Sequence, residues 1–380
     1  MVGRSAYMSA YRSSLILVIS LSLALSLQGA RDAYGERSRV STATPEAETD
    51  ARHEEPTAWR RGVGVALSIA PGLALSGGGH WAVGRPIEAE RLFWLKLGTL
   101  ATLFASGAVV ARSGASEYVT PWGVPLMVTS GVSMMSVTLL DLLGAVSSPA
   151  SQPQALRDAQ TPEVRAGERL NLTLSSGVRV SATRPQHVYW GLGWAQRVGR
   201  WAHHGGVSGA DEQVRTRLGG ARALRAQADW GSWVQLAYTA HLNQRASAEL
   251  HQLELTSRWE GALGALIGPT LSAVRAQLWF GWAGGVIRYP LGDVDASSAI
   301  LGGLTLTHYS LNDRLRVSVG YDHRHDGWEG GAVVSGLGSG VLGFGHAQVM
   351  TKLGDYFWMG ARGAWGSAHV YTLNLGWGSP

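Results

Sequence analysis

The alternation of apolar and polar residues along short segments restricts most strongly what this chain can fold into. In residues 231–243, apolar side chains occupy the even positions from Val234 to Leu242. Mostly polar side chains, such as Gln235 and Thr239, occupy the odd positions. Successive side chains of a β-strand point to opposite faces, so the segment is predicted to be a strand with one apolar and one mostly polar face.

The same alternation returns down the chain, for instance in residues 314–322 and 369–378. Many such strands separated by short turns indicate a sandwich or a barrel. We favour an all-β transmembrane antiparallel barrel of about 12 strands, with its polar face inside and its apolar face towards lipid. The predicted strands are 168–182, 187–198, 215–228, 231–243, 248–266, 272–289, 299–310, 314–325, 328–336, 341–353, 356–366 and 368–378.

The architecture follows from this pattern more firmly than the strand number does. The first strand could be a hairpin, and 248–266 could be two strands. The longest predicted connections, 199–214 and 290–298, fall on the side of the chain ends, whereas long loops of a barrel are expected outside the cell.

The composition agrees with a membrane barrel. Charged residues make up 16% of the chain, compared with about 25% in an average soluble domain. The chain also has 51 Gly and 16 Trp but only 5 Phe, which fits turns and interfacial aromatic girdles. The absence of Cys excludes disulfides, zinc–thiolate sites, thiol nucleophiles and lipoprotein acylation. The net charge of +5 comes with scattered Arg residues, so nucleic acid is not an expected partner.

The N-terminus indicates export. Residues 1–30 carry Arg4 and Arg12, an uncharged core and small residues at Gly29 and Ala30, as in a secretory signal peptide. An uncut signal anchor is the other interpretation. Residues 31–61 have few aliphatic side chains, which predicts a flexible periplasmic segment.

Residues 62–146 have a different character. Two apolar runs, Leu97–Ala111 and Val119–Leu140, predict a small hydrophobic helical hairpin. Each run approaches the ~20 residues that cross a bilayer. The hairpin could stay in the inner membrane, remain in the periplasm or travel with the barrel, and the sequence leaves this open. Residues 147–167 contain three prolines among Ser, Gln and Ala and are predicted to form a linker.

The sharpest local motif lies in this hydrophobic module. It runs Pro71-Gly72, Gly77-Gly78-Gly79-His80, Gly84-Arg85 and Ala89-Glu90-Arg91-Leu92. It resembles the N-terminal PG…GxGH…G module of uncharacterised predicted outer-membrane barrel proteins of Gram-negative bacteria, which implies an envelope protein. His80 and Arg85 are then candidate ligands for a small molecule or a lipid headgroup. The other interpretation is that the glycines serve packing and His80 caps a turn.

Motifs for catalysis or metal binding are weak. His323 and His325 share a strand face, and His203-His204 lies in a Gly-rich segment, but two ligands are too few for a tight site. The segment Gly336–Gly340 places Ser339 outside a Gly-x-Ser-x-Gly nucleophile turn. We therefore predict no catalytic residue, no metal and no cofactor.

The sequence favours a non-enzymatic outer-membrane barrel that is pore-like or structural. Its predicted lumen-lining residues are Gln235, Thr239, Arg314, Arg316, Asp322, Thr372 and Asn374. Expected partners are membrane lipid, lipopolysaccharide included, and the barrel-assembly machinery, whereas the oligomeric state is left open. Two alternatives remain: a lipid-modifying hydrolase with a Ser–His pair on the barrel wall, and an inner-membrane-anchored periplasmic β-domain with Trp residues in its core.

Overall fold

A computed structural model describes most of the chain after residue 55. The described residues are 56–70, 72, 76–114, 116, 119–146, 169–181, 184–210, 213–226, 230–243, 248–310, 314–324 and 343–378. They belong to one unit, residues 56–380. The predicted signal peptide, linker and strand 328–336 lie outside the described residues, as do residues 31–55 of the predicted periplasmic segment.

The N-terminal part is helical, as the apolar runs predicted. Its helices are α2 (Ala58–Ile69), α3 (Gly78–Ala82), α4 (Pro86–Arg112) and α5 (Thr120–Val146). Pro86 occupies the first turn of α4, where its missing N–H leaves no bond unmade. Helices α4 and α5 pack against each other, which confirms the predicted hairpin. Both contain segments long and apolar enough to cross a membrane by length and composition.

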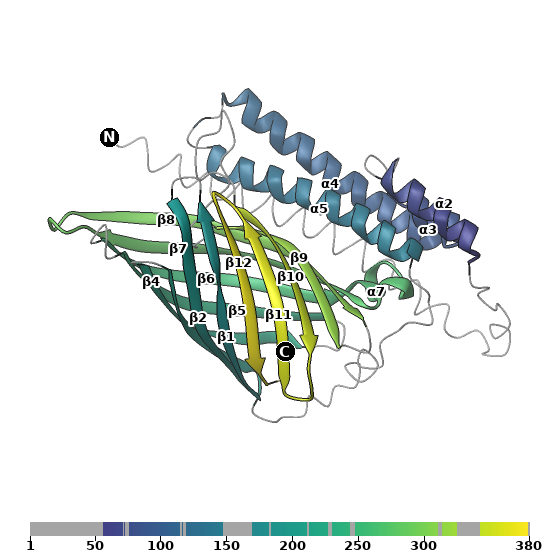
Figure 1. The fold of residues 1–380 in the computed structure, drawn as a ribbon. Helices are drawn as coiled ribbons and strands as arrows, with labels where there is room; N and C mark the ends of the chain where they lie inside the picture. Colours follow the sequence, from purple (N-terminus) through teal and green to yellow (C-terminus); the bar gives the residue numbers. More distant parts are fainter. Residues whose placement is uncertain are drawn as a thin grey trace. The chain divides into compact units, whose positions relative to one another are not determined.

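Twelve strands form a closed antiparallel barrel (Figure 1). Each strand pairs with its neighbours in sequence, and β1 closes the barrel against β12 with Leu174 opposite Leu375. The strands are β1 (Arg169–Ser181), β2 (Arg184–Val198), β3 (Trp201–Ala210), β4 (Gln213–Ala226), β5 (Trp230–Asn243), β6 (Ala248–Ala262), β7 (Val274–Arg288), β8 (Val294–Ser310), β9 (Leu315–His323), β10 (Phe344–Lys352), β11 (Phe357–Trp365) and β12 (Ala368–Trp377). Between β6 and β7 lie α7 (Leu263–Leu266) and the 3-10 helix η2 (Pro269–Leu271).

The predicted number of strands is confirmed, but one assignment was wrong. Residues 201–210 form β3 rather than part of a long connection, and β3 follows β2 after a two-residue turn. Strand β9 pairs directly with β10. Strand β1 is continuous rather than a hairpin, and β6 is one strand rather than two.

Glycines inside the strands make room for tryptophans on the neighbouring strand. Trp194 lies opposite Gly205, and a Cβ added at Gly205 would be 2.7 Å from the Trp194 Nε1 atom. Trp358 lies opposite Gly376, where a Cβ would be 2.0 Å from the indole ring. The high Gly and Trp contents therefore reflect cross-strand packing as well as turns.

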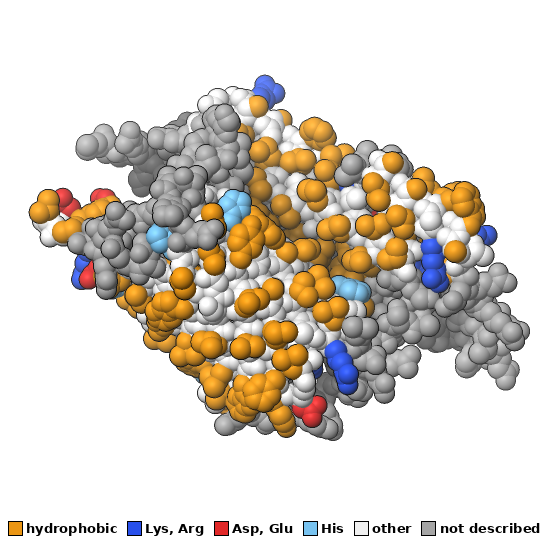
Figure 2. Space-filling model, in the orientation of Figure 1, with side chains coloured by type: hydrophobic (Ala, Val, Ile, Leu, Met, Phe, Trp, Pro, Cys, Tyr) orange, Lys and Arg blue, Asp and Glu red, His pale blue; other side chains and the backbone are white. Residues whose placement is uncertain are grey.

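The two faces of the wall differ as the alternation predicts. On β5, Leu236 is 51% exposed on the outer face, whereas Thr239 is 1% exposed on the inner face. On β12, Leu373 is exposed and Thr372 is buried. Figure 2 shows hydrophobic side chains spread over the outside of the barrel and over the helices. Such a surface suits contact with acyl chains.

Candidate functional sites in the lumen and the helical module

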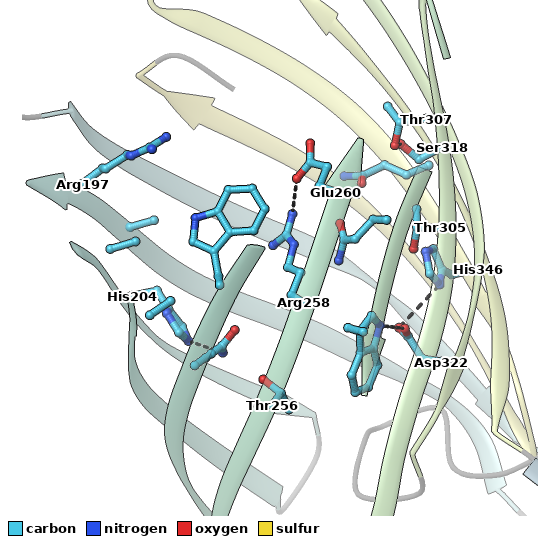
Figure 3. A pocket seen from close by; sticks show the side chains of 18 of the residues that line it. Arg197, His204, Thr256, Arg258, Glu260, Thr305, Thr307, Ser318, Asp322 and His346 are labelled. Atoms are coloured by element: carbon cyan, nitrogen blue, oxygen red, sulfur yellow. Dashed lines mark hydrogen bonds and ion pairs between the residues drawn. The ribbon is translucent and has the colours of Figure 1, made fainter. Parts of the chain in front are cut away.

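The inner faces of the strands enclose a polar cavity of about 800 Å³. Strands β2 to β10 contribute its walls, and Figure 3 shows side chains from several of them pointing into one space. The charged side chains that line it are Arg197, Arg217, Arg258, Arg316, Arg324, Glu260 and Asp322. The aromatic and polar side chains include Trp233, Trp279, Tyr309, His203, His204, His346, Gln235, Gln277, Gln348 and several Thr and Ser. Hydrogen-bonding side chains therefore line the cavity from β2 to β10.

One carboxylate of the wall is fully enclosed by donors. Glu254 on β6 is 1% exposed. It accepts hydrogen bonds from Arg217 Nη2 at 2.6 Å, Arg324 Nη2 at 2.8 Å and Thr239 Oγ1 at 3.1 Å. These bonds join β4, β5, β6 and the end of β9 through one buried carboxyl group, so we assign Glu254 a structural role in the wall. A buried carboxylate needs such partners to stay charged.

The two carboxylates that line the cavity are also bonded. Glu260 contacts Arg258 Nη2 at 2.9 Å and Arg275 Nε at 3.2 Å. Asp322 accepts from Trp279 Nε1 at 3.2 Å and lies 3.5 Å from His346 Nδ1 (Figure 3). The acidic groups of the cavity wall are therefore largely occupied by neighbouring donors.

Three arginines of the cavity lie over aromatic rings. Arg316 Cζ is 5.0 Å from the centre of the Tyr309 ring. Arg258 lies 5.7 Å from the Trp233 ring, and Arg324 lies 5.9 Å from the Trp279 ring. The negative face of an aromatic ring attracts a guanidinium and helps to hold it in place. Such contacts leave its N–H donors for other partners.

The structure divides the predicted lumen residues into four groups. Gln235, Arg316 and Asp322 line the cavity. Thr239 bonds Glu254 inside the wall. Thr372 and Asn374 are buried on β12 outside this cavity, and Asn374 Oδ1 accepts a hydrogen bond from Ser175 Oγ at 2.7 Å. Arg314 is exposed in the turn before β9.

The sequence analysis missed most of the charged cavity. Arg217, Arg258, Arg324, Glu254 and Glu260 were not named, although each lies on the inner parity of a predicted strand or at its end. The alternation of β4 and β6, followed residue by residue, could have identified them. Which of them meet depends on the register between strands, which the pattern does not give.

The motif of the helical module surrounds a buried carboxylate. Asp141 on α5 is fully buried. It accepts from the backbone N–H groups of Gly77 at 2.9 Å, Gly79 at 3.2 Å and His80 at 3.1 Å. The His80 ring adds a fourth contact, from Nδ1 to Asp141 Oδ1 at 2.8 Å. The Gly-Gly-Gly-His segment therefore serves to neutralise one carboxylate between helices.

Two glycines of this cluster have no room for a side chain. Gly77 has φ 110°, a left-handed conformation that favours glycine. At Gly144 a Cβ would be 1.9 Å from His80 Nε2. The close approach of α3 to α5 thus depends on both positions.

Three other charged or titratable groups of the module, His80, Arg85 and Lys96, also contact internal partners. His80 Nε2 lies 3.5 Å from Glu88 Oε2. Arg85 Nη1 donates to the Gly144 carbonyl at 2.6 Å, and burial lowers the pKa of this guanidinium from its ordinary value. Lys96 is 1% exposed, and its Nζ donates to the Gly72 carbonyl at 2.7 Å and to Thr138. His80 and Arg85 therefore sit in a packed cluster rather than at an open pocket.

The described residues contain no group of three or more His, Cys, Asp and Glu side chains that could hold a metal ion. His323 is buried on β9, where its Nδ1 lies 3.1 Å from the Tyr321 hydroxyl. His325 lies outside the described residues. His203 and His204 lie on β3 and line the cavity, and His204 Nε2 is 3.2 Å from Gln235 Nε2.

No protein-family model and no curated protein matches the chain. Among solved structures, it is similar to the KdgM porin in complex with disordered oligogalacturonate, at 6% identity over 55% of this chain and 99% of that one, with a TM-score of 0.39. It is also similar to the translocator domain of the autotransporter NalP from Neisseria meningitidis, at 10% identity over 59% of this chain and 92% of that one, with a TM-score of 0.33. The Acinetobacter baumannii outer membrane protein Omp33 matches at 8% identity over 56% of this chain and 99% of that one, with a TM-score of 0.29.

Proposed function

We propose that this chain is a non-enzymatic outer-membrane protein that lets small polar solutes pass through its barrel. The observation that carries the proposal is the contrast between the two faces of the wall. A cavity of about 800 Å³ with charged and polar walls lies inside, while the outer face exposes Leu, Val and Trp side chains. A polar lumen within an apolar outer belt is the arrangement of a water-filled membrane channel.

The alternative of a soluble periplasmic β-domain fits less well. It requires the tryptophans to lie in a core, yet Trp190, Trp282 and Trp377 are about half exposed on the outer face. In a soluble protein, so large an apolar surface would favour aggregation. Membrane lipid, lipopolysaccharide included, is therefore the partner that we propose for this surface, with insertion by the barrel-assembly machinery.

The alternative of a lipid-modifying hydrolase needs a Ser–His pair on the barrel wall, whereas the histidine that a carboxylate contacts at 2.8 Å lies in the helical module. The His80–Asp141 pair has the geometry of a histidine oriented by a carboxylate. However, His80 is completely buried, and its other ring nitrogen faces Glu88 rather than a hydroxyl nucleophile. This pair supports a structural role for the helical module.

The test is conductance of the purified full-length chain in planar bilayers. A sample whose mobility on gels changes on boiling, as expected for a closed barrel, should give discrete current steps. A sample that shows this heat-dependent mobility but never conducts would contradict the pore and leave a structural role. Retention in the inner-membrane fraction, without a mobility change, would contradict the outer-membrane barrel itself.

A further inference from the structure

We infer that the lumen binds and passes anionic solutes, with a cluster of arginines as the site for their oxyanion groups. This inference rests on the proposed pore and names its substrate class. Five arginines line the cavity, together with two carboxylates. Even when the buried Glu254 is counted, the described part of the wall keeps an excess of positive charge.

Two of these arginines account for the excess of positive charge. Arg316 contacts the Tyr309 ring, and no carboxylate among the described residues pairs with it. Arg197 is exposed at the cavity wall and likewise has no acidic partner in the described part of the chain. Their donors therefore face the cavity water and are available to a solute.

The chemistry of the guanidinium defines the kind of solute. Its planar set of N–H donors matches the two oxygens of a carboxylate or a phosphate. Gln235, Gln277 and Gln348 line the same cavity and supply neutral hydrogen-bonding groups for the rest of the molecule. The low-dielectric wall strengthens the field of the arginines inside the lumen. Small organic or inorganic oxyanions are thus favoured over cations.

The test is the reversal potential of the open channel in a KCl gradient. The wild-type chain should be selective for chloride, and inorganic phosphate added to one side should reduce the chloride current. Arg316→Gln and Arg197→Gln should each lower the chloride preference several-fold and weaken the phosphate block. Arg222→Gln is the matched control, because Arg222 lies outside the cavity and contacts Trp201 on an exposed face; it should leave both properties unchanged.

The outcomes separate the two proposals. Channels without preference for chloride, or with a preference for potassium, would overturn the anion site and leave the pore. The same would follow if Arg222→Gln changed selectivity as strongly as Arg316→Gln. Absence of any channel would overturn both.

A different set of contacts supports a second inference: we propose that the helical hairpin lies in the same bilayer as the barrel, docked on its outer wall. Helix α5 packs against β8 and β9. An apolar cluster joins the hairpin to the barrel, with Leu92 and Leu140 from the helices, Leu271 from η2, and Val274 and Leu306 from β7 and β8.

Polar contacts fix the same junction. Thr270 donates its hydroxyl to Glu88, which is also the carboxylate facing His80. Arg91 Nη1 donates to the carbonyl of Ile267 at 3.1 Å. At Gly268 a Cβ would lie 2.1 Å from Glu88 Oε1, so the connection between β6 and β7 is shaped to receive α4. The hairpin is therefore docked at a specific place.

The rest of the hairpin surface is apolar and open. In the most apolar 18-residue segments of α4 and α5, only 17% and 22% are buried. The core helix of a soluble protein would be mostly buried. Phe104 and Met135 are both more than 60% exposed. This surface continues the apolar belt of the barrel (Figure 2), and the acyl chains around that belt are the occupant that we propose for it.

Two measurements on the full chain test this placement. First, a protease site inserted between residues 146 and 169 allows the hairpin to be separated after purification. The cut hairpin should remain with the barrel in mild detergent, and Glu88→Arg should release it, whereas Glu90→Arg, at an exposed position of the same helix, should not. Release of the wild-type hairpin, or retention in the Glu88→Arg protein, would contradict specific docking.

The second measurement uses the absence of native cysteine. A dye on Phe104→Cys in reconstituted vesicles should be quenched by lipids that carry a quencher on their acyl chains. A dye on Asp355→Cys, in the exposed turn between β10 and β11, should be quenched by a water-soluble quencher instead. Quenching of the Phe104→Cys dye from water alone would place the hairpin outside the bilayer.

Discussion

The buried cluster of the helical module and the wall of the lumen both contain charged groups, but the partners of these groups differ. In the module, Asp141 has four donors, and Lys96 and Arg85 each donate to carbonyl groups. In the lumen, arginines outnumber carboxylates, and Arg316 faces the cavity without an acidic partner among the described residues. Charged groups that are paired inside a packed cluster indicate a structural role, whereas unused donors around a cavity indicate binding.

The largest expected effect is the loss of Asp141. Asp141→Ala leaves three backbone N–H groups and the His80 ring without their acceptor, which should destabilise the helical module by about 3–5 kcal/mol. Limited proteolysis should then cut within α4 and α5, while the barrel keeps its heat-dependent mobility. The control is Asp355→Ala at an exposed turn. Equal protease resistance of the two variants would contradict the structural role of Asp141.

The next effect compares the two faces of one strand. Leu236→Arg places a charge on the lipid face of β5 and should cost about 2–4 kcal/mol near the centre of the bilayer. Gln235→Arg, one residue away, points into the cavity and should fold with little loss. Urea titration of refolded protein in vesicles measures both. A larger loss for the Gln235 variant would reverse the assignment of faces.

A smaller effect tests the close packing of α3 on α5. Gly144→Ala would place a Cβ 1.9 Å from His80 Nε2, and such overpacking costs about 1–3 kcal/mol. Gly131→Ala on the same helix meets no atom within 4 Å and should be neutral or slightly stabilising. The rate at which protease cleaves the module gives the comparison. Identical rates would show that the cluster tolerates expansion.

The smallest effect concerns selectivity alone. Glu260→Gln removes a carboxylate that contacts Arg258 and Arg275, so the lumen becomes more positive. The reversal potential in a KCl gradient should move further towards that of chloride. Glu249→Gln, at a half-exposed position near the start of the same strand, is the control. A shift towards potassium would contradict an electrostatic role for the arginines.

The barrel could be predicted from sequence because its wall imposes a local rule on every strand. Leu236 and Gln235 differ in polarity since one faces outward and the other faces the cavity. Strand β3 escaped prediction because His203-His204-Gly205-Gly206 has the composition of a loop. Gly205 is required there by Trp194 of the neighbouring strand, and that requirement depends on register, which the local pattern does not contain.

The candidate sites were less predictable for the same reason. Asp141 lies 61 residues from His80, and nothing in the sequence marks it as the acceptor of the His80 motif. Glu254 of β6 meets Arg217 of β4 and Arg324, which directly follows β9. Pairings of this kind depend on how helices and strands are packed. The motif around His80 was recognisable, but its buried acceptor was not.

Substituted cysteines tested during single-channel recording give the most direct test of a conducting lumen, because the native chain has none. Gln235→Cys and Leu236→Cys would each be exposed to a charged, water-soluble thiol reagent while the current is measured. If the polar face lines the conducting path, the reagent should reduce the current through the Gln235→Cys channel and leave the Leu236→Cys channel unchanged. A response at Leu236→Cys with none at Gln235→Cys would show that the polar face of the strand does not line the conducting path.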